Sequence, residues 1–193
     1  MKKAFTLIVL TFFSATLLAQ TKAQKERIKE IREEMQETMQ RIEDNKDIAE
    51  YAENRIQLEM SRNLPGSGMQ HYKIDMYISD YGDEEKSEQD WRPFFFRVKY
   101  NYAARNIVHE CLVNPATRKP IFMFRQLPDD DAVYEDRLYF TPNGTLCYAS
   151  ETSYDNPDGK KNVREMKSTD DSVKYNLRFF DQIIKWAMAT QKL

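Results

Sequence analysis

The chain is poor in glycine, histidine and cysteine, and it carries almost no net charge. Only five glycines occur in 193 residues, too scattered to form a loop that cradles a phosphate or a dinucleotide. The 29 basic and 31 acidic side chains give a formal charge of −2, so charge offers no reason to expect a nucleic-acid partner. Two cysteines are too few for a disulfide-dense scaffold. One ordinary globular domain is therefore the simplest interpretation.

Residue types that carry out catalysis are also scarce. The chain has two histidines, His71 and His109, and lacks the short motifs of zinc proteases, serine hydrolases, redox dithiols and nucleotide-binding loops. His109 and Cys111 stand two apart on an expected strand, which places both side chains on one face. A half-buried histidine beside a packed thiol explains this pair more simply than a nucleophile or a metal site does. We therefore predict no catalytic residue, no metal ligand and no cofactor.

Residues 1–19 have the three parts of a secretory signal peptide. Lys2 and Lys3 give a positive start, residues 4–18 form an apolar run, and Ala19 supplies a small residue for cleavage. The run has about 15 residues, fewer than the roughly 20 that a membrane-spanning helix needs. We expect this segment to be removed, leaving no stable membrane span. The protein is then periplasmic or secreted, and the short, Lys-rich start is typical of bacteria.

Residues 20–62 are predicted to form one long amphipathic helix. Apolar and small side chains recur at alternating steps of three and four from Ile28 to Ile56, which keeps them on one face. The strongly charged start, up to about Asp44, is a candidate for projecting beyond the body of the protein. The stripe has two open uses. It packs on the protein's own sheet, which we favour, or it forms a coiled coil between copies through residues 22–56.

The following residues change to the period of two that is typical of strands. Apolar and polar side chains alternate over residues 72–78 and 94–102, and turn sequences separate the later segments. About six antiparallel strands in meander order are expected. A wide apolar stripe then predicts a closing helix over residues 168–193, buried under the domain. The expected fold class is α+β, with residues 63–193 and the preceding helix in one domain.

The clearest hairpin surrounds residues 141–144, Thr-Pro-Asn-Gly. This sequence suits a type I turn with proline at the second position and a left-handed glycine at the fourth, followed by a bulge. The register predicted from that turn places Phe140 opposite Leu146 and Leu138 opposite Tyr148.

Cys111 and Cys147 both lie beyond the expected cleavage site. In an oxidising compartment, one interpretation is a single disulfide between them. The alternative is two small buried side chains, because a free cysteine behaves as a packing residue. Sequence alone leaves both open.

Aromatic side chains are the remaining feature. There are 11 Tyr and 11 Phe but only 2 Trp, and most of them fall in expected strands. Tyrosine combines an apolar ring with a polar tip and suits a binding groove, although a large aromatic core would use the same residues. The candidates for ligand binding are Tyr77, Phe95, Tyr100, Tyr102, Tyr139 and Tyr148.

These features predict a non-catalytic cell-envelope protein that binds a protein partner through its sheet face or its N-terminal helix. A small apolar or sugar ligand is a weaker form of the same prediction. Two alternatives come from other classes. One is a structural protein that self-associates through residues 22–56, with the copies forming a homo-oligomer. The other is a hydrolase that uses scattered carboxylates, whose spacing depends on the fold.

Overall fold

The computed structural model describes most of the chain, namely residues 20–46, 54–66, 68–80, 90–155 and 161–190. The expected signal peptide lies outside these residues. The helices are α2 (Lys22–Asn45) and α3 (Asp171–Thr190). The strands are β1 (Arg55–Leu64), β2 (Gly68–Asp80), β3 (Trp91–Tyr102), β4 (Arg105–Asn114), β5 (Lys119–Pro128), β6 (Ala132–Phe140), β7 (Leu146–Asp155) and β8 (Lys161–Glu165). No helix among the described residues is both long and apolar enough to cross a membrane.

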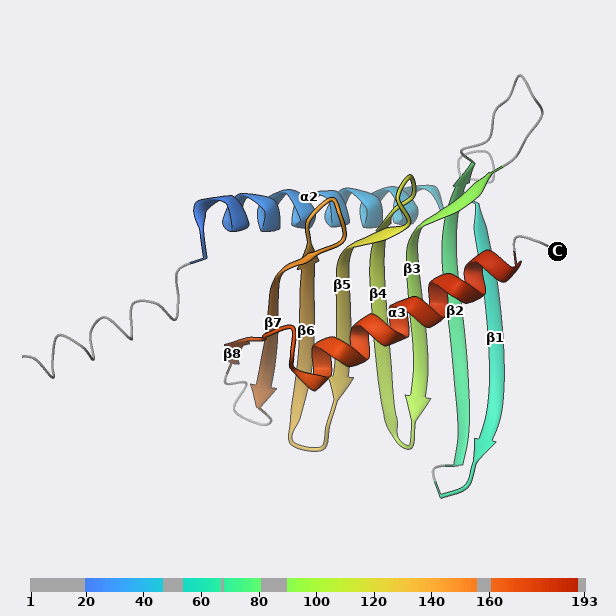
Figure 1. Cartoon of the computed structure of the whole chain (residues 1–193). Helices are drawn as coiled ribbons and strands as arrows, with labels where there is room; N and C mark the ends of the chain where they lie inside the picture. Colours follow the sequence, from blue (N-terminus) through green and yellow to red (C-terminus); the bar gives the residue numbers. More distant parts are fainter. Residues whose placement is uncertain (1–19, 47–53, 67, 81–89, 156–160, 191–193) are drawn as a thin grey trace, which may run out of the picture.

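The eight strands form one antiparallel sheet in which each strand pairs with its neighbours in sequence, from β1 at one edge to β8 at the other. Figure 1 shows α2 crossing one face near one end of the strands and α3 running diagonally over the opposite face. The molecule is a helix–sheet–helix sandwich. The predicted α+β class, the meander order and the two flanking helices are confirmed, but the sheet has eight strands rather than about six.

The predicted helix over residues 20–62 is correct in its first part and wrong over residues 55–62, and residues 47–53 lie outside the described residues. α2 ends at Asn45, and Arg55–Leu64 forms the edge strand β1. In β1, Ile56 and Leu58 alternate with polar residues and pair with β2. This period of two, together with a partner strand, outweighs the helical spacing that Ile56 shares with α2. The other unpredicted strand, β8, is exposed at all five residues, so it has no apolar alternation to reveal it.

The apolar stripe of α2 packs on the protein's own sheet, as favoured from the sequence. Ile28 and Ile31 lie over β4, β5 and β6, and Ile42 lies over β3. The start of the helix does not project, because the Gln24 side-chain amide donates to the Cys147 carbonyl in β7 at 3.0 Å. The apolar stripe of α2 is therefore buried against the sheet of the same chain.

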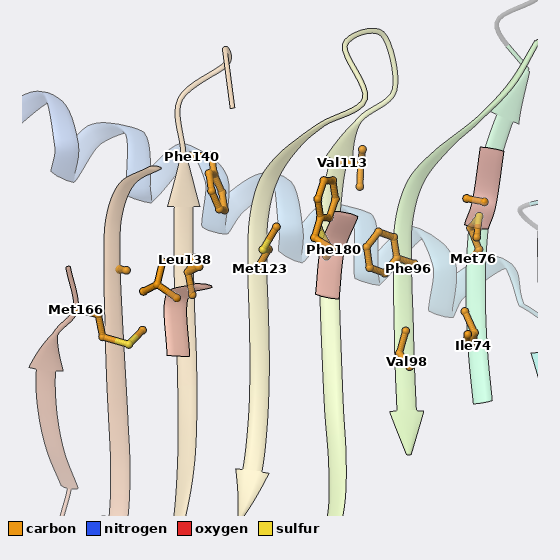
Figure 2. Packing of buried hydrophobic residues seen from close by; sticks show 14 residues of the cluster. Ile74, Met76, Phe96, Val98, Val113, Met123, Leu138, Phe140, Met166 and Phe180 are labelled. Atoms are coloured by element: carbon orange, nitrogen blue, oxygen red, sulfur yellow. The ribbon is translucent and has the colours of Figure 1, made fainter. Parts of the chain in front are cut away.

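The stripe predicted for the closing helix faces the sheet. Val173, Phe180 and Ala187 of α3 are buried, and the Phe180 ring stacks on Phe96 of β3 with centroids 5.9 Å apart. Figure 2 shows the labelled members of this cluster: Ile74, Met76, Phe96, Val98, Val113, Met123, Leu138, Phe140, Met166 and Phe180. The helix begins at Asp171, three residues after the predicted start. The main core therefore lies between α3 and the sheet.

The hairpin between β6 and β7 has the predicted turn, and its glycine has a positive φ of 77°. The pair nearest the turn is also as predicted. The next pairs differ, because Leu138 lies opposite Ala149 and not opposite Tyr148. An irregularity in the ladder takes up one residue of β7, so Tyr148 pairs with Tyr139 and shares its face.

Replacing Ile31 by alanine is expected to lower the free energy of unfolding by about 2–5 kcal/mol, since it removes a fully buried side chain and leaves a cavity under α2. Urea unfolding measures the change. The control is Lys29→Ala, one of the exposed positions of the same helix, which is expected to shift stability by no more than about 0.5 kcal/mol. Equal stability of the two variants would contradict the docking of α2.

Candidate functional site: a groove beside helix α3

Because α3 runs diagonally, it leaves part of the sheet uncovered on its side. This part lies at the ends of the strands near β1 that are farther from α2 (Figure 1). A groove of about 1200 Å³ lies there. This volume is somewhat larger than that of most small-molecule sites, which is roughly 300–1,000 Å³. Its lining comes from β1 to β5 and from α3: Met60, Ser61, Arg62, Leu64, Gln70, Tyr72, Ile74, Val98, Tyr100, Tyr102, Ile107, Arg125, Leu127, Tyr175, Arg178, Phe179, Gln182 and Ile183.

The floor of the groove is a row of apolar side chains that crosses four strands. Met60 of β1 pairs with Tyr72 of β2, Tyr72 with Tyr100 of β3, and Tyr100 with Ile107 of β4. Side chains at paired positions lie on the same face of a sheet, so the row is continuous. The Tyr72 and Tyr100 rings stack with centroids 5.0 Å apart and planes 14° apart. Strand alternation thus places a flat aromatic surface at the bottom of the groove.

His109 lies in β4 beneath α3 and is only 3% exposed. Its ring stacks on Phe179 with centroids 4.1 Å apart and lies within 6 Å of the Tyr100 and Tyr175 rings. Its Nε2 is buried and has no hydrogen-bond partner among the described residues. Burial, together with the positive charge of Arg125, lowers the pKa of His109 to about 3. His109 is therefore a neutral packing residue at neutral pH.

An ion pair ties the start of α3 to the sheet. Arg125 Nη2 of β5 lies 2.6 Å from Asp136 Oδ2 of β6, and the aspartate side chain is 1% exposed. From α3, the Ser172 hydroxyl and the Asn176 amide both donate to the same carboxylate oxygen. The Arg125 guanidinium also lies over the Tyr175 ring, 5.1 Å from its centroid. These charge-assisted contacts hold the helix that forms the wall of the groove.

The structure does not bring the six aromatic candidates together. Tyr100 and Tyr102 line the groove. The other four lie on the α2 side: Tyr77, Phe95, Tyr139 and Tyr148. Phe95 and Tyr139 are almost completely buried there, at 0% and 1% exposure, so they belong to the core under α2.

The other lining residues of the groove were not identified as site residues from the sequence, and Met60, Tyr72, Arg125 and Tyr175 show why. Tyr72 had a usable signal, since it opens the alternation over residues 72–78 and shares the face of Ile74. Met60 was assigned to a helix. Arg125 and Tyr175 had no local signal, because they meet only when α3 packs on β5.

The proposed disulfide between Cys111 and Cys147 is not formed, and both cysteines are free. Cys111 belongs to the cluster under α3, whereas Cys147 packs with the cluster under α2. Two strands separate β4 from β7, which puts the residues roughly 14 Å apart across the sheet. A disulfide needs Cα atoms about 4–7 Å apart. The alternative prediction, two small buried side chains, is correct for Cys111, whereas Cys147 is only partly buried.

Within the part of the chain that is described, no group of three or more His, Cys, Asp or Glu side chains is arranged to hold a metal ion. Comparison of the chain with protein-family models, curated proteins and solved structures finds no match. Because a fold alone does not define an activity, the chemistry of the groove is the basis for its function.

The free energy of unfolding is expected to fall as the pH is lowered from about 7.5 to about 5, partly through His109. A histidine in the unfolded chain has a pKa of about 6.5, whereas the pKa of His109 in the fold is about 3. In this interval the unfolded chain therefore takes up a proton that the fold does not. Linkage gives a loss of about 2 kcal/mol from this group.

His109→Phe retains a ring against Phe179 and removes the titrating group. Over the same interval it is expected to lose about 2 kcal/mol less than the natural protein, as measured by urea unfolding at both pH values. An identical loss in the two proteins would show that His109 is not held neutral.

The two thiols are expected to react differently with Ellman's reagent. Cys111 is 2% exposed and burial raises its thiol pKa, so it should react only after unfolding. Cys147 is partly exposed, with a pKa also raised by burial, and should react slowly in the folded protein. Cys147→Ser is expected to abolish the reaction of the folded protein. No free thiol in unreduced, unfolded protein would reveal a disulfide and contradict the structure.

Proposed function

We propose that this protein is a non-catalytic binding protein that takes a partly apolar small molecule in the groove beside α3. The observation that carries the proposal is the aromatic floor, where Met60, Tyr72, Tyr100 and Ile107 form one row across four strands. Tyrosine rings provide apolar contact area with little loss of side-chain entropy, and their hydroxyls provide hydrogen bonds. A concave, largely apolar site with a few polar groups is the usual form of a small-molecule site.

Exposed apolar surface at the groove supports this function. Met60 is 46% exposed and Tyr102 is 47% exposed, although both are large and line the groove. Covering such surface with a ligand is favourable by roughly 25 cal/mol per Å² of apolar area removed from water. In a closed core the same side chains would already be covered. Their exposure therefore fits a ligand that binds reversibly.

The groove gives less support to a hydrolase that uses carboxylates. Of the described residues, no aspartate or glutamate lines it. The buried carboxylate of Asp136, which pairs with the lining residue Arg125, is also held by Ser172 and Asn176. The His109 ring is stacked on aromatic rings and its pKa is lowered, so it is a poor proton acceptor at neutral pH.

A protein partner, which the sequence favoured, stays a prediction. The apolar stripe of α2, which either a partner or a second copy would use, already packs on the sheet. The open surface on the α3 side is hollowed, which suits a small molecule better. Because residues 1–19 predict export, we propose that the protein binds its ligand in the periplasm or outside the cell.

Binding of Nile red, an uncharged apolar dye, tests this function. The dye is expected to bind with increased fluorescence, and Met60→Glu is expected to weaken binding about tenfold, since a charged side chain at the floor opposes an apolar occupant. Fluorescence titration measures the affinity.

Met69→Glu is the matched control. Met69 is 49% exposed in β2, but it alternates with the groove-lining Gln70 and so lies on the other face of the sheet. Its variant is expected to bind the dye as the natural protein does. Absence of dye binding, or equal weakening by both variants, would overturn the proposal.

A further inference from the structure

The charged side chains of the groove are all of one sign. Arg62, Arg125 and Arg178 line it, and none of the lining residues in the described part of the chain is acidic. Composition does not account for this, because the whole chain has slightly more acidic than basic residues. The groove is therefore a positively charged region on a nearly neutral protein.

Two of these arginines have no carboxylate within ion-pair distance among the described residues. Arg62 donates only to neutral groups, from Nε to Gln70 Oε1 at 3.1 Å and from Nη2 to the Tyr72 hydroxyl at 3.3 Å. Arg178 donates from Nε to the Lys174 carbonyl of its own helix at 3.3 Å. By contrast, Arg125 is neutralised by Asp136.

Outside the groove, arginines in or next to the strands have a carboxylate within ion-pair distance, whereas Arg32 of α2, which donates to the Tyr139 hydroxyl, has none among the described residues. The pairs are Arg55 with Asp75, Arg97 with Glu110, Arg105 with Asp129, Arg118 with Asp90, Arg137 with Glu135 and Arg164 with Glu151. The positive charges left uncompensated beside the aromatic floor match an anionic group on a ligand. A guanidinium binds a carboxylate through two parallel hydrogen bonds, so arginine suits this role.

We infer that the ligand of the groove is an amphipathic organic acid, a single apolar chain or ring system with one anionic headgroup. The inference deepens the proposed function and rests on it. The apolar part lies along Tyr72 and Tyr100, and the acid group lies at the rim, where Arg62 and Arg178 donate to it. The Arg62 guanidinium already lies over the Tyr72 ring, 5.6 Å from its centroid, which places the charge next to the apolar floor.

Displacement of Nile red by two amphiphiles of equal chain length tests the charge preference. Dodecanoate and dodecyltrimethylammonium share an alkyl chain and differ in the sign of the headgroup. At low ionic strength and below micelle formation, dodecanoate is expected to displace the dye at a concentration at least about tenfold lower. Added salt is expected to narrow the difference, because it screens exposed charges.

Arg62→Gln and Arg178→Gln are each expected to weaken dodecanoate binding about threefold to tenfold, and to weaken the binding of the uncharged dye Nile red clearly less. Arg55→Gln is the matched control, since Arg55 lies in the same strand as Arg62 and outside the groove. It is expected to change neither affinity.

The outcomes separate the two proposals. Failure of Nile red to bind overturns the binding function itself. If Nile red binds but the two amphiphiles displace it equally, or if the groove variants behave as Arg55→Gln does, the inference of an acidic ligand is overturned while the binding function stands.

Discussion

An eight-stranded sheet has two faces to cover, and the described chain has two helices with which to cover them. Strand spacing makes the sheet roughly 34 Å wide. α2 is roughly 36 Å long and α3 roughly 30 Å, and each covers a strip about 10 Å across. Each face therefore keeps an uncovered part. On the α2 side the strands nearest β1 carry exposed polar residues such as His71, Lys73 and Lys99, which water solvates. On the α3 side the uncovered part is aromatic, and it forms the groove.

The position of the groove depends on where α3 begins. Arg125 and Asp136 face each other across β5 and β6, and the helix binds this pair through Ser172 and Asn176. A buried ion pair gains its stability from good geometry and additional hydrogen bonds, and losing one partner leaves an uncompensated charge. The pair therefore acts as a specific anchor. From this point α3 runs diagonally towards β1, and its packing over His109 closes one side of the groove.

The groove brings two chemistries together. Its floor is a stacked pair of tyrosines, and its rim carries arginines without carboxylate partners among the described residues. An apolar ligand alone would not need those charges, and an inorganic anion would not need the floor. An amphipathic acid uses both. The four aromatic candidates outside the groove pack under α2, where Phe95 and Tyr139 are buried.

Patterns confined to one segment could be recognised from the sequence, because short-range periodicity decides them. The alternation at residues 72–78, the apolar stripe of α3 and the left-handed turn glycine all correspond to observed elements. Features that depend on contact with a distant segment could not be recognised from the sequence. Ile56 suits a helix or a strand equally, and β2 decides between them. A single irregularity in β7 sends Tyr148 to the other face, and the order of strands separates Cys111 from Cys147. Side-chain types and local periods were determined by the sequence. The groove, its positive charge and the neutral state of His109 arise only when α3 crosses the sheet, because each depends on contacts between residues that are far apart in the chain.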